Sequence, residues 1–534
     1  MDLKEENLMD EIGKKKKKKT IITTFIVILI LILCGILAYY FLFLKKDNGK
    51  NKNQNVNNII LESEYEMSGN ELEDFDLTFL KLENNEENMI YSPLSIKYAL
   101  AMLAEGANGK TKEQITSILG KYQAKKYANS KNMSMANALF IKNSYKDSIK
   151  DSYTNALKTK YNAEVIYDPF KNPNNLNSWV ENKTLNLINN LFDDVSELDY
   201  ALVNALAIDM DWINELQEVF GNYEITYQHE KYSYFIPCLN KIDSEVPSLN
   251  YFELEFRNSS KVNSVKIGAV INKYDIVNIL GEQNIRKTIS DAYEKWKVEN
   301  PNELIDDFDE YLDQYIYDLD KNYGNVSSST DFEFYVDKDV KVFAKDLKKY
   351  DGRTLQYIGI MPTEENLSDF IANLDKKELS NIISNLKSIE MKNFKEGVIT
   401  EISGYIPVFK YEYELNLVND LKKLGVTDIF DEEKADLSSL TEDKTKIIDA
   451  KHKANIEFSN EGITAAAATF IGGEGNTIGG FDYLYDVPVE YIDLTFNRPY
   501  LYLIRDKDSN EVWFVGTVYE PTLYEEYSLE NEEF

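Results

Sequence analysis

An apolar segment without a single charge, close to the N-terminus, constrains this chain more than any other feature. It runs from Ile21 to Leu44, and a helix of that length, rising about 1.5 Å per residue, crosses a hydrocarbon core of about 30 Å. Six consecutive lysines at 14–19 precede it, and only two lysines follow it directly. Because the more positive flank stays inside, we expect residues 1–20 to form a cytoplasmic basic tail and everything after residue 46 to lie outside the cell, behind a single-pass signal-anchor.

Two other interpretations of this segment are open. A cleaved signal peptide would have a shorter apolar region ending at a small-x-small site, which this segment lacks. A lipoprotein signal ending at Cys34 would need a small residue at Leu33, and ten more apolar residues follow. We therefore expect a transmembrane helix over 21–44. Residues 45–65 are polar and rich in Asn and Lys, so they are expected to form a tether.

Composition excludes several classes of function. With 59 basic against 91 acidic residues the net charge is -32, so we expect no nucleic-acid partner. Cys34 lies in the apolar segment and Cys238 stands alone, which excludes a disulfide-stapled scaffold. His229 and His452 are the two histidines, and no cluster at ligand spacing accompanies them. We therefore predict no metal site and no cofactor, and a protein that is not an enzyme.

Helical patterns dominate the first half of the chain and strand-like runs the second. Ser92-Pro93 is a good helix start, and 174–192 is a second amphipathic helical pattern. The run 200–208 is short, continuous and apolar, as in a buried strand. Three strand-like runs follow near the end, at 452–459, 498–506 and 512–520. This distribution predicts one α+β domain over 66–525, followed by an acidic tail at 526–534.

Eight motifs, taken in order, resemble the serpin family, the serine protease inhibitor superfamily. They are Asn88–Ile96, Gly106–Thr111, Trp179-Val180 with Thr184, Leu202–Ala205 leading to Trp212, Asp436, His452–Ala454, Glu461–Thr469, and Arg498-Pro499-Tyr500 with Gly516 and Pro521. The resemblance implies a serpin-like fold with a large mixed β-sheet, further sheets and about eight helices. The span at about 213–330 is longer than the corresponding span of the family, so the resemblance also implies an insertion there.

The resemblance implies a suicide-type peptidase inhibitor. A serine (or cysteine) peptidase cleaves the reactive centre loop, which then inserts as a strand into the large sheet and drags the acylated enzyme along. Small uncharged side chains suit a hinge that must enter a closed core. The resemblance assigns this loop hinge to Glu461, Gly462, Ile463, Thr464, Ala465, Ala466, Ala467, Ala468 and Thr469. It assigns a sheet-opening latch to Ser92, Ser95, Asn204 and His452, and the breach at the point of insertion to Trp212 and Asn460.

The position of the scissile bond has two candidates. The family's hinge-to-cleavage spacing places it at Asn476-Thr477, but the loop is longer than usual, which leaves Tyr483, Leu484 and Tyr485 as an alternative. No Lys or Arg occurs between Phe470 and Asn497. We therefore expect a target peptidase that is not trypsin-like, because a trypsin-like pocket requires a cation.

Other differences from the family bear on partners. The stretch Lys121–Met135 is too short for the helix that binds heparin in some members, so we expect no heparin cofactor, and we expect a monomer. Asn460, Ile463 and Asp209 replace the family's usual glutamate, threonine or serine, and lysine. Asn460 and the long glycine-rich loop favour the alternative function, a non-inhibitory serpin-fold cell-surface binding protein acting through the acidic insertion, whereas the alanine hinge argues against it. The insertion itself is either a docking module or a solvated decoration.

Overall fold

The computed structural model describes residues 74–120, 122–218, 225–240, 248–302, 305–321, 326–327, 331–460, 462–463, 481, 483 and 487–522, with 217–218, 225–240, 248–261, 320–321, 326–327 and 462–463 as backbone alone. The predicted cytoplasmic tail, transmembrane helix, tether and acidic tail lie outside these residues. None of the helices in the described part is both long and apolar enough to span a bilayer.

The largest sheet has seven strands and is antiparallel throughout. Its order is β1 (Met89–Tyr91), β21 (Val512–Val518), β20 (Tyr500–Asp506), β13 (Leu355–Pro362), β12 (Val340–Asp346), β11 (Phe332–Val336) and β14 (Lys387–Ser388). Every residue of β13, β20 and β21 is buried. These mainly apolar strands therefore form the centre of the core, covered on both faces.

Two smaller sheets are separate from the largest one. One is β3 (Glu164–Asp168), β2 (Met133–Lys142) and β4 (Tyr200–Ile208), with β2 parallel to β3 and antiparallel to β4. The other is the antiparallel pair β16 (Phe409–Asn416) and β17 (Lys451–Phe458). The prediction that the large sheet is mixed is therefore wrong for the largest sheet, because its pairings are all antiparallel and β3–β2–β4 is a separate sheet.

The remaining strands form smaller groups. One sheet contains β10 (Val326–Ser327), β9 (Ser264–Asn272), β15 (Ile399–Pro407) and β19 (Val489–Asp493), with β6 (Gln217–Glu218) also paired to β9. A long hairpin is made by β7 (Ile225–Asn240) and β8 (Ser248–Val262). Finally, β5 (Met210–Asp211) pairs with β18 (Gly462–Ile463).

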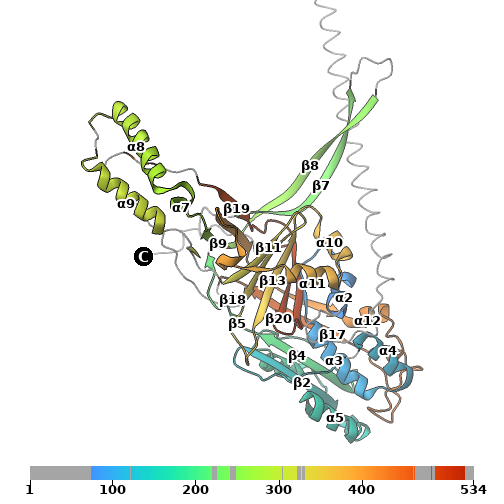
Figure 1. Cartoon of the computed structure of the whole chain (residues 1–534). Coiled ribbons are helices and arrows are strands. Elements are labelled where there is room, and N and C mark those ends of the chain that lie inside the picture. Colours follow the sequence, from blue (N-terminus) through green and yellow to red (C-terminus); the bar gives the residue numbers. More distant parts are fainter. Residues whose placement is uncertain are drawn as a thin grey trace, which may run out of the picture. The chain divides into compact units, whose positions relative to one another are not determined.

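The described residues contain more α-helices than the eight predicted. They are α2 (Asp74–Leu82), α3 (Pro93–Gly106), α4 (Gly109–Leu119), α5 (Asp151–Tyr161), α6 (Asn174–Lys183), α7 (Ile276–Leu280), α8 (Glu282–Glu299), α9 (Phe308–Lys321), α10 (Leu367–Asn373), α11 (Lys376–Ser384) and α12 (Leu417–Lys423). Short 3-10 turns cover Asn143–Ser148, Met391–Asn393 and Asp428–Phe430. The three helices above eight are α7, α8 and α9, which all lie in the insertion (Figure 1).

Two helix boundaries test the sequence interpretation directly. Helix α3 begins as predicted, with the Ser92 hydroxyl accepting a hydrogen bond from the Ser95 amide at 3.0 Å. Helix α6 ends at Lys183, so the prediction of one helix over 174–192 is wrong beyond that residue. Leu185 and Asn186 adopt positive φ angles of 56° and 63°, which a right-handed helix cannot continue through.

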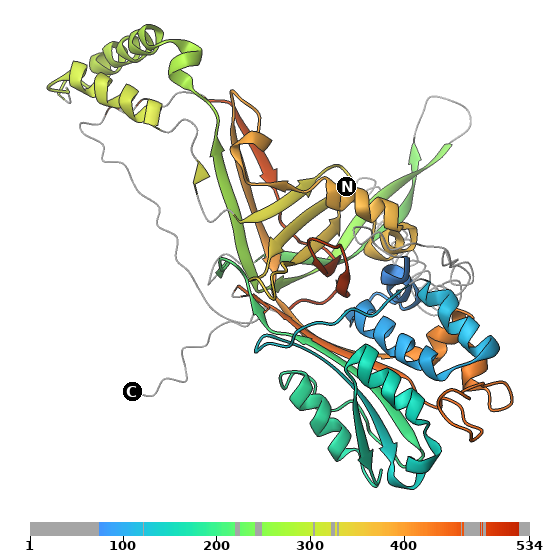
Figure 2. The same ribbon diagram turned by 60° about the horizontal axis from the view of Figure 1, so that its bottom comes forward.

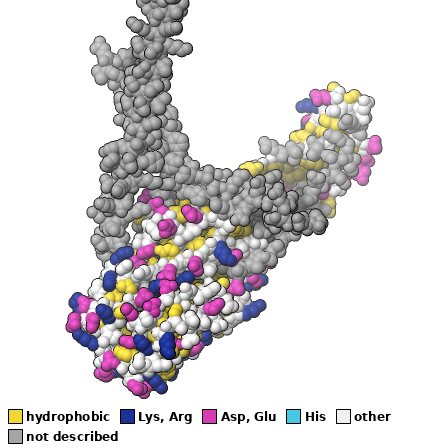
Figure 3. All heavy atoms as spheres, turned by 180° about the vertical axis from the view of Figure 1, so that it is seen from behind, with side chains coloured by type: hydrophobic (Ala, Val, Ile, Leu, Met, Phe, Trp, Pro, Cys, Tyr) yellow, Lys and Arg dark blue, Asp and Glu magenta, His cyan; other side chains and the backbone are white. Residues whose placement is uncertain are grey.

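Helix α6 covers one face of the sheet β3–β2–β4, and the two segments lie together in Figure 2. Phe140, Val180 and Val203 are among the buried side chains between them. On the face that Figure 3 shows, lysine and arginine side chains are interspersed with aspartate and glutamate rather than gathered in one patch. This intermixed surface resembles that of a solvated domain rather than a phosphate-binding one.

Candidate functional site

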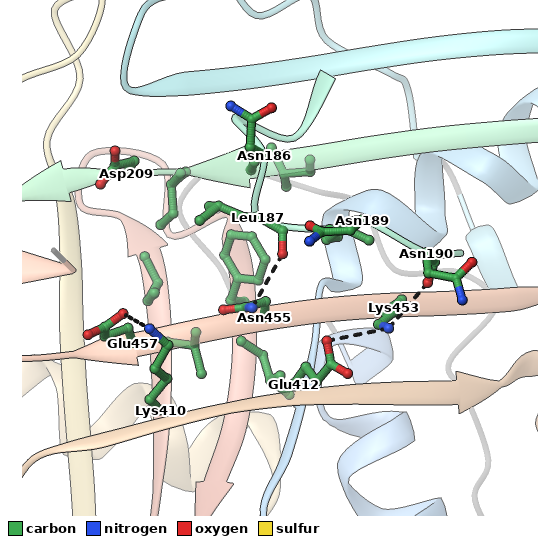
Figure 4. Close-up of a pocket in the computed structure, with 18 residues that line it drawn as sticks. Asn186, Leu187, Asn189, Asn190, Asp209, Lys410, Glu412, Lys453, Asn455 and Glu457 are labelled. Atoms are coloured by element: carbon green, nitrogen blue, oxygen red, sulfur yellow. Dashed lines mark hydrogen bonds and ion pairs between the residues drawn. The ribbon is translucent and has the colours of Figure 1, made fainter. Parts of the chain in front are cut away.

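The candidate site is a slot between the facing edges of β4 and β17. Within the described residues these two strands share no pairing, and in Figure 4 they run in the same direction on either side of a cavity. The cavity has a volume of about 560 Å³ and contacts the end of β4, the middle of β17 and the segment 186–190. A second cavity of about 310 Å³ lies between the other ends of the same strands. The unpaired backbone edges on both sides form a template for one more strand.

After β17 the chain turns into this slot, at the end where β4 continues into β5. Gly462 is registered opposite Asp211, and Ile463 opposite Met210, in an antiparallel pairing with β5. These two residues of the predicted loop hinge therefore already occupy the position of an additional strand next to β5. Glu461 and the hinge residues Thr464, Ala465, Ala466, Ala467, Ala468 and Thr469 lie outside the described residues.

The structure brings together the four side chains expected to form the latch. The Ser95 hydroxyl is hydrogen bonded to the Asn204 side-chain oxygen, and the Ser92 amide donates to Nε2 of His452 at 2.9 Å. Ser92 and Ser95 are themselves joined through the helix cap. The group therefore connects α3 to both β4 and β17, beneath the slot.

A fifth member of this group, Asn137, was missed by the sequence analysis. The Asn204 amide donates to Oδ1 of Asn137 at 2.7 Å, and the Asn137 amide donates to the Tyr161 carbonyl at 2.8 Å. Asn137 is 5% exposed. The available signal was a lone amide in the apolar run of β2, since a buried amide requires partners.

His452 is held neutral by its surroundings. Burial lowers its pKa to about 4. The hydrogen bond from Ser92 has the same consequence, because Nε2 must be unprotonated to accept it. The histidine is therefore a neutral member of the polar group at neutral pH.

The breach residues lie at the C-terminal end of β17. Trp212 is fully buried, packs edge-on against Phe458 with ring centroids 5.6 Å apart, and donates from Nε1 to the Ser459 carbonyl at 3.1 Å. Asn460 is buried, and its carbonyl accepts from the Leu216 amide at 2.7 Å. The two hydrogen bonds fix where the chain turns out of β17, since each involves a backbone carbonyl at the turn.

Acidic side chains surround the same end of the slot. Burial raises the pKa of Asp209, and the neighbouring charges of Asp211 and Glu457 raise it further. Lys410 forms an ion pair with Glu457 at 2.7 Å. Asp209 thus contributes a negative charge to the cavity where the family resemblance implies a positive one.

The segment that follows α6 crosses the slot and is bonded to β17. The Asn455 amide donates to the Leu187 carbonyl at 3.3 Å, and Lys453 donates to the Asn190 carbonyl at 3.2 Å (Figure 4). Lys451 adds an ion pair with Asp193 at 3.3 Å. A strand that enters the slot must displace these contacts or shift the crossing segment outward.

The two candidate scissile positions differ in what the structure describes. Asn476, Thr477, Leu484 and Tyr485 lie outside the described residues. Tyr483 is described, and its carbonyl accepts a hydrogen bond from the Tyr315 hydroxyl of α9 at 2.7 Å. The alternative scissile position therefore begins on a residue that is bound to the helical insertion.

Comparison with known proteins agrees with this architecture. The family described as Serpin (serine protease inhibitor) matches residues 73–220 and 326–521. Mouse neuroserpin is 24% identical over 472 residues, covering 83% of this chain and 88% of the relative. The native structure of the thermophilic serpin tengpin superposes with a TM-score of 0.54 at 20% identity, covering 84% of this chain and 92% of the other. Human thyroxine-binding globulin complexed with its ligand superposes with a TM-score of 0.52 at 19% identity, covering 84% and 97%.

The protein class that these features define is a serpin-like α+β fold with an antiparallel core sheet and a slot beside the hinge. Because the family match covers more than half of the chain, the chain belongs to the serpin family. The unmatched stretch between residues 220 and 326 contains the hairpin β7–β8, the strand β9 and the helices α7 to α9.

Proposed function

We propose that this chain is an extracytoplasmic, membrane-anchored serpin, which inhibits a serine or cysteine peptidase by cleavage of its reactive loop and insertion of that loop into the slot. One observation carries the proposal. Two residues of the hinge, Gly462 and Ile463, are already paired with β5, where β5 continues the edge of β4 that is unpaired among the described residues. A strand that extends this pairing needs no change of register.

Extending the register predicts where each hinge residue goes. Ala465 would lie opposite Ile208, Ala467 opposite Leu206, and Thr469 opposite Asn204. Residues that face each other across an antiparallel pair point to the same side of the sheet. Since Asn204 points toward α3, the alternate hinge residues would point into the core.

The cavity accommodates small side chains at these positions. Ile90, Ile504 and Phe514 contact it from the core sheet, so an inserted alanine gains apolar burial without clashing. A charged side chain there would lose its hydration without a partner. The alanine-rich hinge therefore matches the slot chemically as well as in register.

Membrane anchoring and the extracytoplasmic position rest on the charge-free segment 21–44 and the lysines before it. We propose a single-pass arrangement with the N-terminus in the cytoplasm. Alkaline extraction should leave the full-length chain in the membrane fraction, and external protease should digest the serpin domain in intact cells. Release at alkaline pH, or protection of the serpin domain, would contradict this arrangement.

Inhibition is tested by mixing the full-length chain with chymotrypsin-like, elastase-like and subtilisin-like peptidases, followed by denaturing gels. A covalent band at the summed mass supports inhibition. Plain cleavage of the loop with full peptidase activity supports the second candidate, a non-inhibitory binding protein, which Asp209 and Asn460 at the breach favour. We expect no effect of heparin in either case, because the described residues 122–132 form no helix.

A further inference from the structure

The insertion contains a small hydrophobic core of its own, to which the reactive loop contributes. We call residues 276–321, with helices α7, α8 and α9, the helical module. Its buried cluster consists of Ile276, Ile285, Ile289, Tyr293, Leu312 and Ile316 from the module, together with Phe481 from the loop. Phe481 is separated from the module by more than 150 residues of sequence, yet it is 5% exposed.

Aromatic rings of the module surround Phe481. The ring centroids of Tyr293, Trp296 and Tyr311 lie 5.1, 5.5 and 5.9 Å from that of Phe481. The contacts with Tyr293 and Tyr311 are edge-to-face, a favourable geometry for aromatic pairs. The module thus buries this side chain in an aromatic site rather than against a flat surface.

A directional contact fixes the next part of the loop. The hydroxyl of Tyr315 donates to the carbonyl of Tyr483 at 2.7 Å. Tyr483 and Val487 also pack against the same cluster. The loop is therefore held by the backbone of Tyr483 as well as by the Phe481 side chain.

The module is itself braced where it receives the loop. Tyr293 stacks on Phe308 with centroids 4.0 Å apart, which joins α8 to α9. Its hydroxyl accepts from the Ile305 amide at 2.8 Å. Arg286 on α8 pairs with Asp313 on α9 at 2.6 Å. These contacts hold the two helices beside each other, so the aromatic site does not depend on the loop alone.

We propose that the helical module is an intramolecular receptor for the C-terminal half of the reactive loop, and that it confines cleavage by a peptidase to bonds before Phe481. This inference rests on the proposed function only in treating the loop as the segment that the target peptidase cleaves. A peptidase binds several consecutive residues in extended form with free backbone groups. The Phe481 side chain is buried and the Tyr483 carbonyl is engaged, so these two residues must leave the module before a peptidase can bind them.

Chymotrypsin provides the probe, because the loop offers it aromatic residues on both sides of the proposed boundary. Phe470 is the one aromatic residue between Gly462 and Phe481, and Phe481, Tyr483 and Tyr485 follow. Initial cuts in the full-length chain are mapped by mass spectrometry. We expect the wild type to be cut after Phe470 and to resist cutting after Tyr483 and Tyr485. In Phe481→Ala, cutting after the two tyrosines should accelerate about ten- to a hundredfold, while cutting after Phe470 is unchanged.

Two further variants sharpen the test. Tyr315→Phe removes only the hydroxyl that binds the Tyr483 carbonyl, and should accelerate cutting after Tyr483 about three- to tenfold without unfolding the module. Val298→Ala, at a side chain that is 80% exposed on α8, should behave as wild type. Equal ratios of cutting after Tyr483 and Phe470 in wild type, Phe481→Ala and Tyr315→Phe would overturn the proposal. The measurement records where the loop is cut and does not require inhibition of the peptidase. It therefore tests the helical module even if the chain proves not to be an inhibitor.

Discussion

The two halves of the reactive loop are held by different kinds of contact. The N-terminal half is attached at Gly462 and Ile463 through backbone pairing with β5, and small, uncharged side chains follow. The C-terminal half is attached through Phe481, buried among aromatic rings, and through the carbonyl of Tyr483. Backbone pairing can extend residue by residue, whereas aromatic burial anchors a single position. The comparison indicates a loop with one end ready to move and one end fixed.

The largest expected effect comes from blocking the movable end. Ala465→Pro removes a backbone donor and adds a ring in the middle of the new strand, so the strand cannot complete its hydrogen bonds there. We expect the covalent complex with a susceptible peptidase to fall about a hundredfold while cleavage of the loop continues. Denaturing gels and residual peptidase activity measure this. Ala465→Gly keeps the donor and should retain most of the complex, and undiminished inhibition by Ala465→Pro would contradict insertion.

Cutting the loop without replacing any residue tests the same end in a different way. Once severed before Phe481, the hinge is free to fill the slot and bury apolar surface against β20 and β21. We expect the midpoint of thermal unfolding to rise by about 10 °C or more, measured by calorimetry on intact and nicked protein. The increase in the unfolding midpoint should persist in Phe481→Ala, because the C-terminal half of the loop, which contains residue 481, does not enter the slot. An unchanged midpoint after cleavage would show that the slot does not accept the hinge.

The polar group beneath the slot gives a smaller effect. Asn204→Ala leaves Ser95 and the buried amide of Asn137 without their shared partner. We expect the free energy of unfolding of the uncleaved protein to fall by about 1–3 kcal/mol in urea titrations. Asn182→Ala, on the exposed side of α6, should change it by less than about 0.5 kcal/mol. A loss as small as that of the control would mean that the group does not hold the strands.

The smallest expected effect is a dependence on pH. His452 has a folded-state pKa of about 4, below its unfolded value near 6.5. Its contribution to stability is therefore complete above about pH 6.5 and is lost as the pH falls toward 4, because only the unfolded chain takes up the proton. Between pH 7 and 5 we expect the wild type to lose about 1–2 kcal/mol more than His452→Gln in urea titrations. Equal losses would show that the histidine is protonated as easily in the folded protein.

Several conclusions followed from local sequence patterns because they depend on neighbouring residues. Ser92-Pro93 indicated the start of α3, since a hydroxyl cap and a proline at the first position act within one helical turn. The order of the serpin motifs indicated the family, which the match over 73–220 and 326–521 shows. The end of α6 was predicted nine residues too late, because the amphipathic pattern continues through Leu185 and Asn186 although the backbone does not.

By itself, the sequence determined the family and predicted the hinge and a target that is not trypsin-like, since each depends on which residues follow one another. Only the tertiary structure decided that β4 and β17 belong to separate sheets, that Asn137 joins the polar group, and that Phe481 lies in the helical module. Tyr315 and Tyr483, which form one of the decisive contacts, are 168 residues apart. Periodicity along a chain reports which face of an element is apolar, but not which distant segment that face will contact.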